Sequence, residues 1–208
     1  MAGKKMFRTD DFKSPTMRGS YLQGLFKARA NAEGGTEKFG CTLIGENKDR
    51  AVLEAEVKKC IVGEWGEKGL ERAAKGLIKS PFLDGDGKEA HNKKTGELNP
   101  GMGAGLFFIR PSAIFEPAVR YKSRSIQASP EEVYSGCYGF AVLNCYAWSH
   151  PTNGDGVSFG IAMFQKTGDG ERLGGGGGVD VDKWYETVES SDAPAETKGG
   201  AGAGGLFG

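Results

Sequence analysis

Aromatic side chains recur at alternating positions along residues 136–148, which read GCYGFAVLNCYAW. In an extended strand, such alternation separates the side chains onto two faces. One face would carry mostly large side chains, namely Tyr138, Phe140, Val142, Asn144, Tyr146 and Trp148. Aromatic faces can stack on nucleobases of any type, at about 1–3 kcal/mol per base. The same face could instead be the core of a barrel, which Val142 favours and Asn144 opposes. A split between exposed and buried aromatics is a third arrangement.

Basic side chains lie near these aromatics in the sequence. Residues 120–124 (RYKSR) form the densest basic stretch and contain no acidic residue. Cations for the phosphates and aromatic faces for the bases are what binding a single strand requires, although this stretch could also be an ordinary solvated turn. The residues that we expect to contact DNA are Arg18, Lys27, Arg29, Arg110, Arg120, Tyr121, Lys122, Arg124, Tyr138, Tyr146 and Trp148.

Residue patterns for catalysis are missing from the sequence. It contains no phosphate-binding P-loop, no nucleophile elbow and no zinc-protease motif. Asp84 and Asp86 resemble the start of a calcium loop, but the further ligands are absent, so we interpret the segment as a turn. The cysteines show no metal-binding spacing, and His91 and His150 stand in unrelated contexts. We therefore expect no enzymatic activity, no cofactor and no metal, and four free thiols.

The elements that must position these residues are mostly strands. Residues 17–29 and 38–45 are expected to form a hairpin across a turn at 31–36. Two helices follow, over residues 49–62 and 67–78, and then a long loop over 84–105. The later strands are expected at 106–110, 114–121, 136–148 and 157–166. The fold class is therefore mainly β with a helical insertion (α+β), as an OB-like small antiparallel β-barrel.

Composition divides the chain into three parts. Residues 1–15 are expected to be an irregular lead-in, residues 16–173 the barrel domain with its helical insertion at about 49–79, and residues 174–208 a flexible, glycine-rich acidic tail. Residues 179–208 carry six acidic and two basic side chains, whereas residues 1–178 carry 21 acidic and 25 basic ones. A basic body with an acidic tail is typical of a protein whose tail competes with DNA, although a neutral globule with a solvated tail has the same charges.

The tail ends in an apolar pair, Leu206 and Phe207, on a polar tether. This tip is expected to bind a replication partner unless it is simply disordered. The sequence contains no apolar run long enough for a membrane span and no secretory signal. We therefore expect no membrane association and a cytoplasmic location, the host cytoplasm if a phage encodes the chain.

Two stretches, EVYSGCYGFAVLNCYAW and GVSFGIAMFQKTGDGERLGGG, resemble phage single-stranded DNA-binding proteins long catalogued as a domain of unknown function. The segments YLQGLFKARA, KFGCTLI, PFLDGD and LFFIRPSA agree in order, and the resemblance covers about residues 15–185. Tyr138, Tyr146 and Trp148 match aromatic positions of the family motif. Relatives carry a basic residue where Phe140 stands here, so the resemblance leaves the role of Phe140 open.

The resemblance implies an OB-fold and sequence-independent binding of single-stranded DNA in phage replication or recombination. The expected partner is single-stranded DNA, and the tail, which lies beyond the resemblance, adds phage replication proteins as expected partners. A homo-oligomer is left open by the sequence. Two alternatives stay open: a recombination mediator that anneals complementary strands, and a phage interaction protein with no nucleic-acid role.

Overall fold

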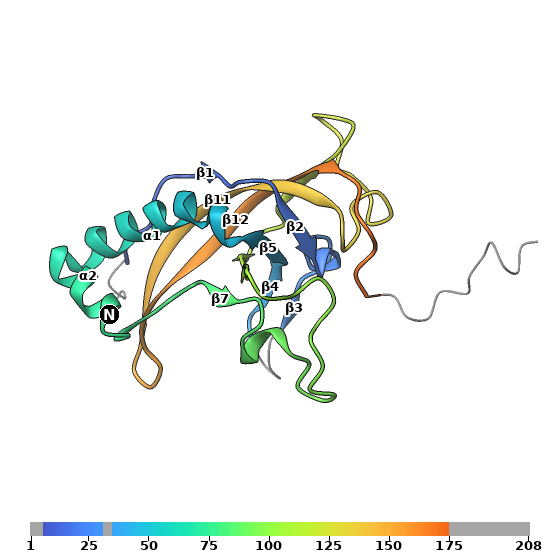
Figure 1. The fold of residues 1–208 in the computed structure, drawn as a ribbon. Helices are drawn as coiled ribbons and strands as arrows, with labels where there is room; N and C mark the ends of the chain where they lie inside the picture. Colours follow the sequence, from blue (N-terminus) through green and yellow to red (C-terminus); the bar gives the residue numbers. More distant parts are fainter. Residues whose placement is uncertain (1–5, 31–34, 175–208) are drawn as a thin grey trace, which may run out of the picture. The chain divides into compact units, whose positions relative to one another are not determined.

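Two long strands, β11 (Tyr138–His150) and β12 (Gly154–Gly168), form the antiparallel hairpin around which the computed structural model is organised (Figure 1). The structure describes residues 6–30 and 35–174. Apart from Gly174, the expected acidic tail with Leu206 and Phe207 lies outside the described residues. The hairpin confirms the two expected strands. The first is shifted by two residues from 136–148, and the second extends beyond 157–166 at both ends.

The sheet curls because the segments 37–46 and 106–113 each contribute two strands that pair at different places in it. Short strands complete it: β1 (Phe12–Lys13), β2 (Met17–Ser20), β3 (Arg29–Ala30), β4 (Glu37–Gly40), β5 (Thr42–Glu46), β6 (Ile78–Lys79), β7 (Leu83–Asp84), β8 (Leu106–Ile109), β9 (Ser112–Ala113) and β10 (Ala118–Arg120). β11 pairs with β2, β2 with β5, and β5 with β8. After a bend at Arg110 and Pro111 the same segment continues as β9, which pairs with β4 and with β12. The sheet thus leaves the hairpin from β11 and returns to it at β12, which is the curvature expected of an OB-like barrel.

The small face of β11 points into the core. Cys137, Ala141, Leu143, Cys145 and Ala147 are at most 3% exposed and belong to the main hydrophobic cluster. β12 has one extra residue opposite each of two positions on β11, so the alternation on β11 itself is unbroken. The aromatic face therefore lies outside the core, which decides between the alternatives that the sequence left open.

Two helices cover one side of the hairpin (Figure 1). α1 (Arg50–Trp65) packs on β11 through its buried side chains Leu53, Val57, Cys60 and Ile61. α2 (Glu67–Ala74) follows after Gly66, whose φ of 66° suits glycine. This confirms the mainly β fold with a helical insertion. No helix among the described residues is long and apolar enough to cross a membrane.

Several expected elements were wrong in detail. The strand expected over 17–29 ends at Ser20, and a 3₁₀ helix (Leu22–Leu25) follows because Leu22 and Leu25 turn inward and are fully buried. The second helix ends at Ala74, since Ile78 leaves it to pair with β12. The segment 114–121 is a strand only over Ala118–Arg120, and the 84–105 loop contains a short 3₁₀ helix (Lys88–Ala90).

Residues 7–14 are more regular than a lead-in. They run along β11, with Phe12 and Lys13 paired to Leu143 and Val142. The hydroxyl groups of Thr9 and Ser14 accept hydrogen bonds from backbone N–H groups of β11, each over 2.9 Å. This segment, called the N-terminal strap below, therefore satisfies strand-edge groups that would otherwise lack partners.

Candidate nucleic-acid interface

The outer face of the β11–β12 hairpin combines large side chains from β11 with small or polar ones from β12. Tyr146 lies opposite Ser158, Asn144 opposite Gly160, and Phe140 opposite Gln165. Neighbouring strands widen this face, since Arg120 of β10 flanks Gln165 and Lys79 of β6 flanks Gly156. Because residues paired across a sheet point to the same side, these side chains share one surface.

Glycines on β12 form the floor on which the β11 side chains lie. A Cβ atom on Gly156 would overlap the Trp148 indole, and one on Gly160 would lie 2.5 Å from Asn144 Oδ1. The Trp148 indole N–H donates a hydrogen bond of 3.0 Å to Ser158 Oγ. The Trp148 ring can therefore lie directly over Gly156, which has no side chain, and its hydrogen bond to Ser158 fixes its position.

A cavity of about 550 Å³ opens over the middle of this face. Its floor includes Asn144, Tyr146 and Gly160, and residues 112–117 form one wall. Arg8 of the strap and Lys38 of β4 supply positive charge, and Glu116 is the one acidic residue among the described residues that line it. Phe115 stands at the rim and is 79% exposed, the highest value among the large hydrophobic residues described.

A second cavity, of about 280 Å³, adjoins the first, because Lys38 and Ser112 line both. It adds Tyr21, Arg29, Phe39 and Arg110, and none of the described residues that line it is acidic. We call the two cavities together the groove. In the groove, four cations (Arg8, Arg29, Lys38 and Arg110) face three partly or largely exposed aromatic rings (Tyr21, Phe115 and Tyr146) and the half-buried Phe39.

The structure brings three of the expected contact residues into the groove: Arg29, Arg110 and Tyr146. Arg110 also bonds to Glu89, through the carboxylate at 3.3 Å and the backbone carbonyl at 3.1 Å. Since this ion pair is half exposed, it holds the guanidinium in place at little energetic cost or gain.

Arg18 and Tyr138 lie together at the far end of β11, outside the groove. The Arg18 guanidinium donates hydrogen bonds to the carbonyl groups of Gly136 and Glu171, over 3.3 and 2.8 Å, and lies 5.9 Å from the Tyr138 ring. Arg18 therefore ties the strand to residues 169–173. Tyr138 remains 41% exposed and open to a stacking partner.

The basic stretch at 120–124 is organised by its own contacts. Arg120 donates to the carbonyl of Arg124 over 2.9 Å and to that of Val119 over 3.0 Å, whereas Lys122 and Arg124 are exposed. Tyr121 is half-buried, with the ammonium group of Lys166 4.3 Å from its ring centroid. Of the four expected DNA contacts here, Lys122 and Arg124 present free surface, and none of the four lines the groove.

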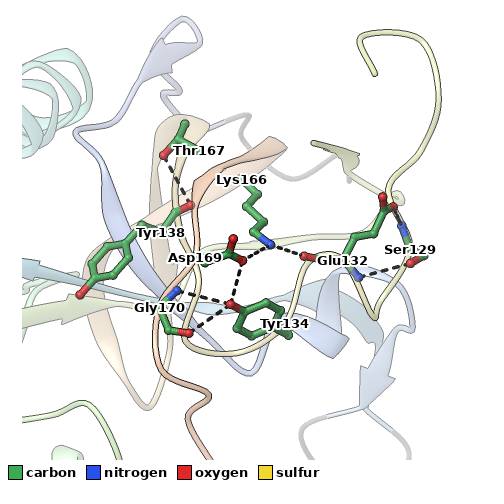
Figure 2. A network of polar contacts seen from close by, with 8 residues as sticks. All are labelled: Ser129, Glu132, Tyr134, Tyr138, Lys166, Thr167, Asp169 and Gly170. Carbon is green, nitrogen blue, oxygen red and sulfur yellow. Dashed lines mark hydrogen bonds and ion pairs between the residues drawn. The ribbon is translucent and has the colours of Figure 1, made fainter. Parts of the chain in front are cut away.

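Figure 2 shows the polar network around Lys166, a residue that the sequence did not single out. Its buried ammonium group donates 2.8 Å to the carbonyl of Glu132 and pairs with Asp169 over 2.6 Å, while Tyr134 also donates to Asp169. Burial lowers the pKa of Lys166, but the hydrogen bond and charge of Asp169 outweigh it, so the pKa lies above its usual value. The bond from Lys166 also holds the pKa of Asp169 below its ordinary range.

Trp148 and Lys27 lie apart from these groups. The ammonium group of Lys79 lies 6.0 Å from the Trp148 ring, at the end of the outer face near α2. Lys27 is exposed and lines neither cavity of the groove.

Sequence reasoning missed Arg8, Tyr21, Lys38 and Phe115. Arg8 belongs to the stretch interpreted as an irregular lead-in, and Lys38 is an exposed residue at the start of the expected strand at 38–45, in which no other basic residue stands. The run of adjacent apolar residues Ile114 and Phe115 beside Pro117 was the one usable signal, because proline is disfavoured inside a regular strand.

The described residues form neither a metal cluster nor a reactive thiol. Within residues 6–30 and 35–174 no three His, Cys, Asp or Glu side chains gather to hold a metal ion. The four cysteines are free and buried, and burial raises their pKa values, that of Cys60 to about 11. A thiol with a raised pKa is a poor nucleophile.

A family model described as the single-stranded DNA-binding protein of Enterobacter phage Enc34 matches residues 12–194. The chain belongs to this family. This confirms the resemblance seen in the sequence. The chain is also 30% identical over 167 residues to "Putative protein p50" of Acyrthosiphon pisum secondary endosymbiont phage 1, covering 78% of this chain and 80% of that protein.

Solved structures of the Enc34 protein share its fold. Its complex with single-stranded DNA is 18% identical, covers 83% of this chain and 100% of that chain, and superposes with a TM-score of 0.58. A second structure of the same protein is 21% identical, covers 85% of this chain and 90% of that chain, and gives a TM-score of 0.55. The expected OB-like architecture is thus the one that members of the Enc34 family adopt.

Proposed function

We propose that the chain binds single-stranded DNA without reading its sequence and protects it during phage DNA replication and recombination. The groove carries this proposal, because it supplies cations for phosphates and aromatic faces for bases on one continuous surface. Membership of a family whose Enc34 member is solved in complex with single-stranded DNA supports it. The chain would act as a binding protein rather than an enzyme, in the cytoplasm of the phage's host.

The composition of the groove favours contacts that every nucleotide can make. Guanidinium and ammonium groups of Arg8, Arg29 and Lys38 attract phosphates, which are the same at each nucleotide. The rings of Phe115 and Tyr146 offer flat faces, and every base has a face to stack on. Sequence independence follows from this pairing of charge and stacking.

The expected contacts outside the groove would extend this surface. Tyr138 and Trp148 stand at opposite ends of the outer face, and Lys122 and Arg124 are exposed beside it. Arg18 and Arg120 would not touch phosphates. They would support the DNA-binding surface by holding the neighbouring protein backbone in place. Lys27 stays a prediction that rests on its charge and exposure.

The primary test is fluorescence anisotropy with labelled oligo-dT, oligo-dC and a mixed-sequence strand, with a matched duplex as control, at two salt concentrations. The proposal expects salt-sensitive binding of all three strands and weaker binding of the duplex. Absence of binding at low salt by folded protein, with and without residues 179–208, would leave an interaction protein as the better explanation. Annealing of complementary strands by the bound protein would add the mediator role.

Phe115→Ala tests the groove itself, with Ile126→Ala as the matched control. Both side chains are apolar and largely exposed, at 79% and 68%, but only Phe115 lines the groove. Loss of one stacked base should weaken binding by about 5- to 150-fold, the equivalent of about 1–3 kcal/mol. Equal affinities of the two variants would place the DNA elsewhere.

The C-terminal tip, Leu206 and Phe207, is proposed to bind a phage replication protein, with the acidic tail competing with DNA for the basic surface. The support is its sequence alone, since the tip lies outside the described residues. Leu206→Ser with Phe207→Ser should abolish capture of the phage replication proteins from infected cells and leave DNA affinity unchanged. Undiminished capture would contradict this role.

A further inference from the structure

Tyr21 has an unusual backbone conformation. Its φ of 54° and ψ of 34° lie in the left-handed region, and no other non-glycine residue among those described has a positive φ. Bulky side chains rarely adopt this region because Cβ approaches the carbonyl oxygen. Such strain persists only where the surroundings enforce it, and it is concentrated at functional sites.

The surroundings of Tyr21 enforce this conformation from both sides. Ser20, before it, pairs with Thr42 in the β2–β5 ladder. Leu22, after it, is fully buried, and its N–H group donates 3.2 Å to Ser135 Oγ. The chain must therefore reverse at Tyr21 itself, and the left-handed turn directs the phenol ring outward, where the side chain is 57% exposed.

The ring stands between two cavities. On one side is the second cavity of the groove, with Arg29 and Arg110. On the other is a third cavity of about 280 Å³, lined by Tyr21 together with Ser20, Gln23, Pro100, Ser135, Leu173 and Gly174. None of the described residues that line either cavity is acidic. Tyr21 is the one described residue that lines both.

We propose that Tyr21 stacks on a base at the end of the groove and directs the following nucleotide into the third cavity. This inference rests on the proposed function, since it extends the same DNA path. On the groove side, Arg29 and Arg110 hold the phosphates of the nucleotides that lead up to the stacked base. The amide of Gln23 and the backbone of Gly174 offer uncharged polar contacts to the next nucleotide. The strained backbone is retained because a right-handed residue at this position would turn the ring away.

The test combines binding with stability. Tyr21→Ala and Tyr21→Asn remove the ring, and asparagine also tolerates the left-handed region. Both variants should bind oligo-dT about 5- to 150-fold more weakly, and Tyr21→Asn should have a thermal midpoint equal to or above that of the wild type. Tyr21→Phe keeps the ring and should bind as the wild type does. Leu77→Asn, an exposed apolar residue that lines none of the three cavities, is the matched control.

Oligonucleotide length tests the third cavity. With oligo-dT of increasing length, the affinity of the wild type should keep rising past the length at which Tyr21→Ala reaches its plateau. If the wild type binds and Tyr21→Ala binds equally well at every length, this inference is overturned and the proposed function stands. If the wild type itself does not bind, the proposed function fails. A fall in thermal midpoint for Tyr21→Asn together with unchanged affinity would assign the strained turn to folding instead.

Discussion

Removing two groove cations should change how binding responds to salt. Four cations line the groove, and each phosphate neutralised on a single strand contributes about −0.7 to the slope of log K against log salt concentration. The groove cations should therefore contribute about −2.8 to the wild-type slope, which is a factor of about 50 in affinity between 50 and 200 mM salt. Arg8→Gln with Lys38→Gln should make the slope shallower by about 1.4 and the loss of affinity over this range about 7-fold smaller.

The assay is fluorescence anisotropy of labelled oligo-dT across a salt series, with the full chain. Lys68→Gln with Lys75→Gln is the matched control, because it changes the net charge equally at exposed positions on and beside α2. The control should keep the wild-type slope, since only cations that contact phosphates release counterions. A slope that falls equally in both double variants would mean that overall charge, not the groove, attracts DNA, and the site assignment would be refuted.

Three further outcomes follow from the packing. Gly156→Ala would push against the Trp148 indole and should destabilise the fold by about 1–3 kcal/mol, seen as a lower denaturant midpoint; an unchanged midpoint would contradict the floor described above. The folded-state pKa of Asp169 is lowered by Lys166, so its contribution to stability is present above the unfolded-state pKa and is lost as pH falls through the folded-state pKa; Asp169→Asn should flatten the acid side of the stability profile in urea titrations at different pH values. The buried thiols, with the pKa of Cys60 raised to about 11, should react with a disulfide reagent only as the protein unfolds, and rapid labelling of the native protein would disagree with their burial.

Residues with strong local patterns were predictable from the sequence. The β11–β12 hairpin was found because alternation over thirteen residues and a turn rich in glycine and proline agree with each other. The first helix was found from the spacing of Leu53, Val57 and Ile61. Alternation placed Tyr146 on the aromatic face of this strand, but only the structure shows that this face lies outside the core.

Residues whose roles depend on distant contacts were not predictable. Tyr21 reads as part of a strand, and only the inward turn of Leu22 onto the barrel gives it a left-handed backbone. Arg8 enters the groove because its segment pairs with β11, more than 130 positions away in the sequence. Lys166 reads as a surface lysine at the end of a strand, yet Asp169, Tyr121 and Tyr134 close over it. Such placements are tertiary, and no local pattern encodes them.

The glycine floor of β12 has a consequence for how this surface can evolve. Trp148 fills the space above Gly156, and Asn144 fills the space above Gly160. The combined side-chain volume of each pair is therefore fixed. A larger residue on β12 is acceptable only where its partner on β11 becomes smaller. We therefore expect homologous chains to vary these positions as pairs, and a single substitution to be accepted more readily after its partner has changed. The outer face of the hairpin should therefore change in units of two residues, one from each strand.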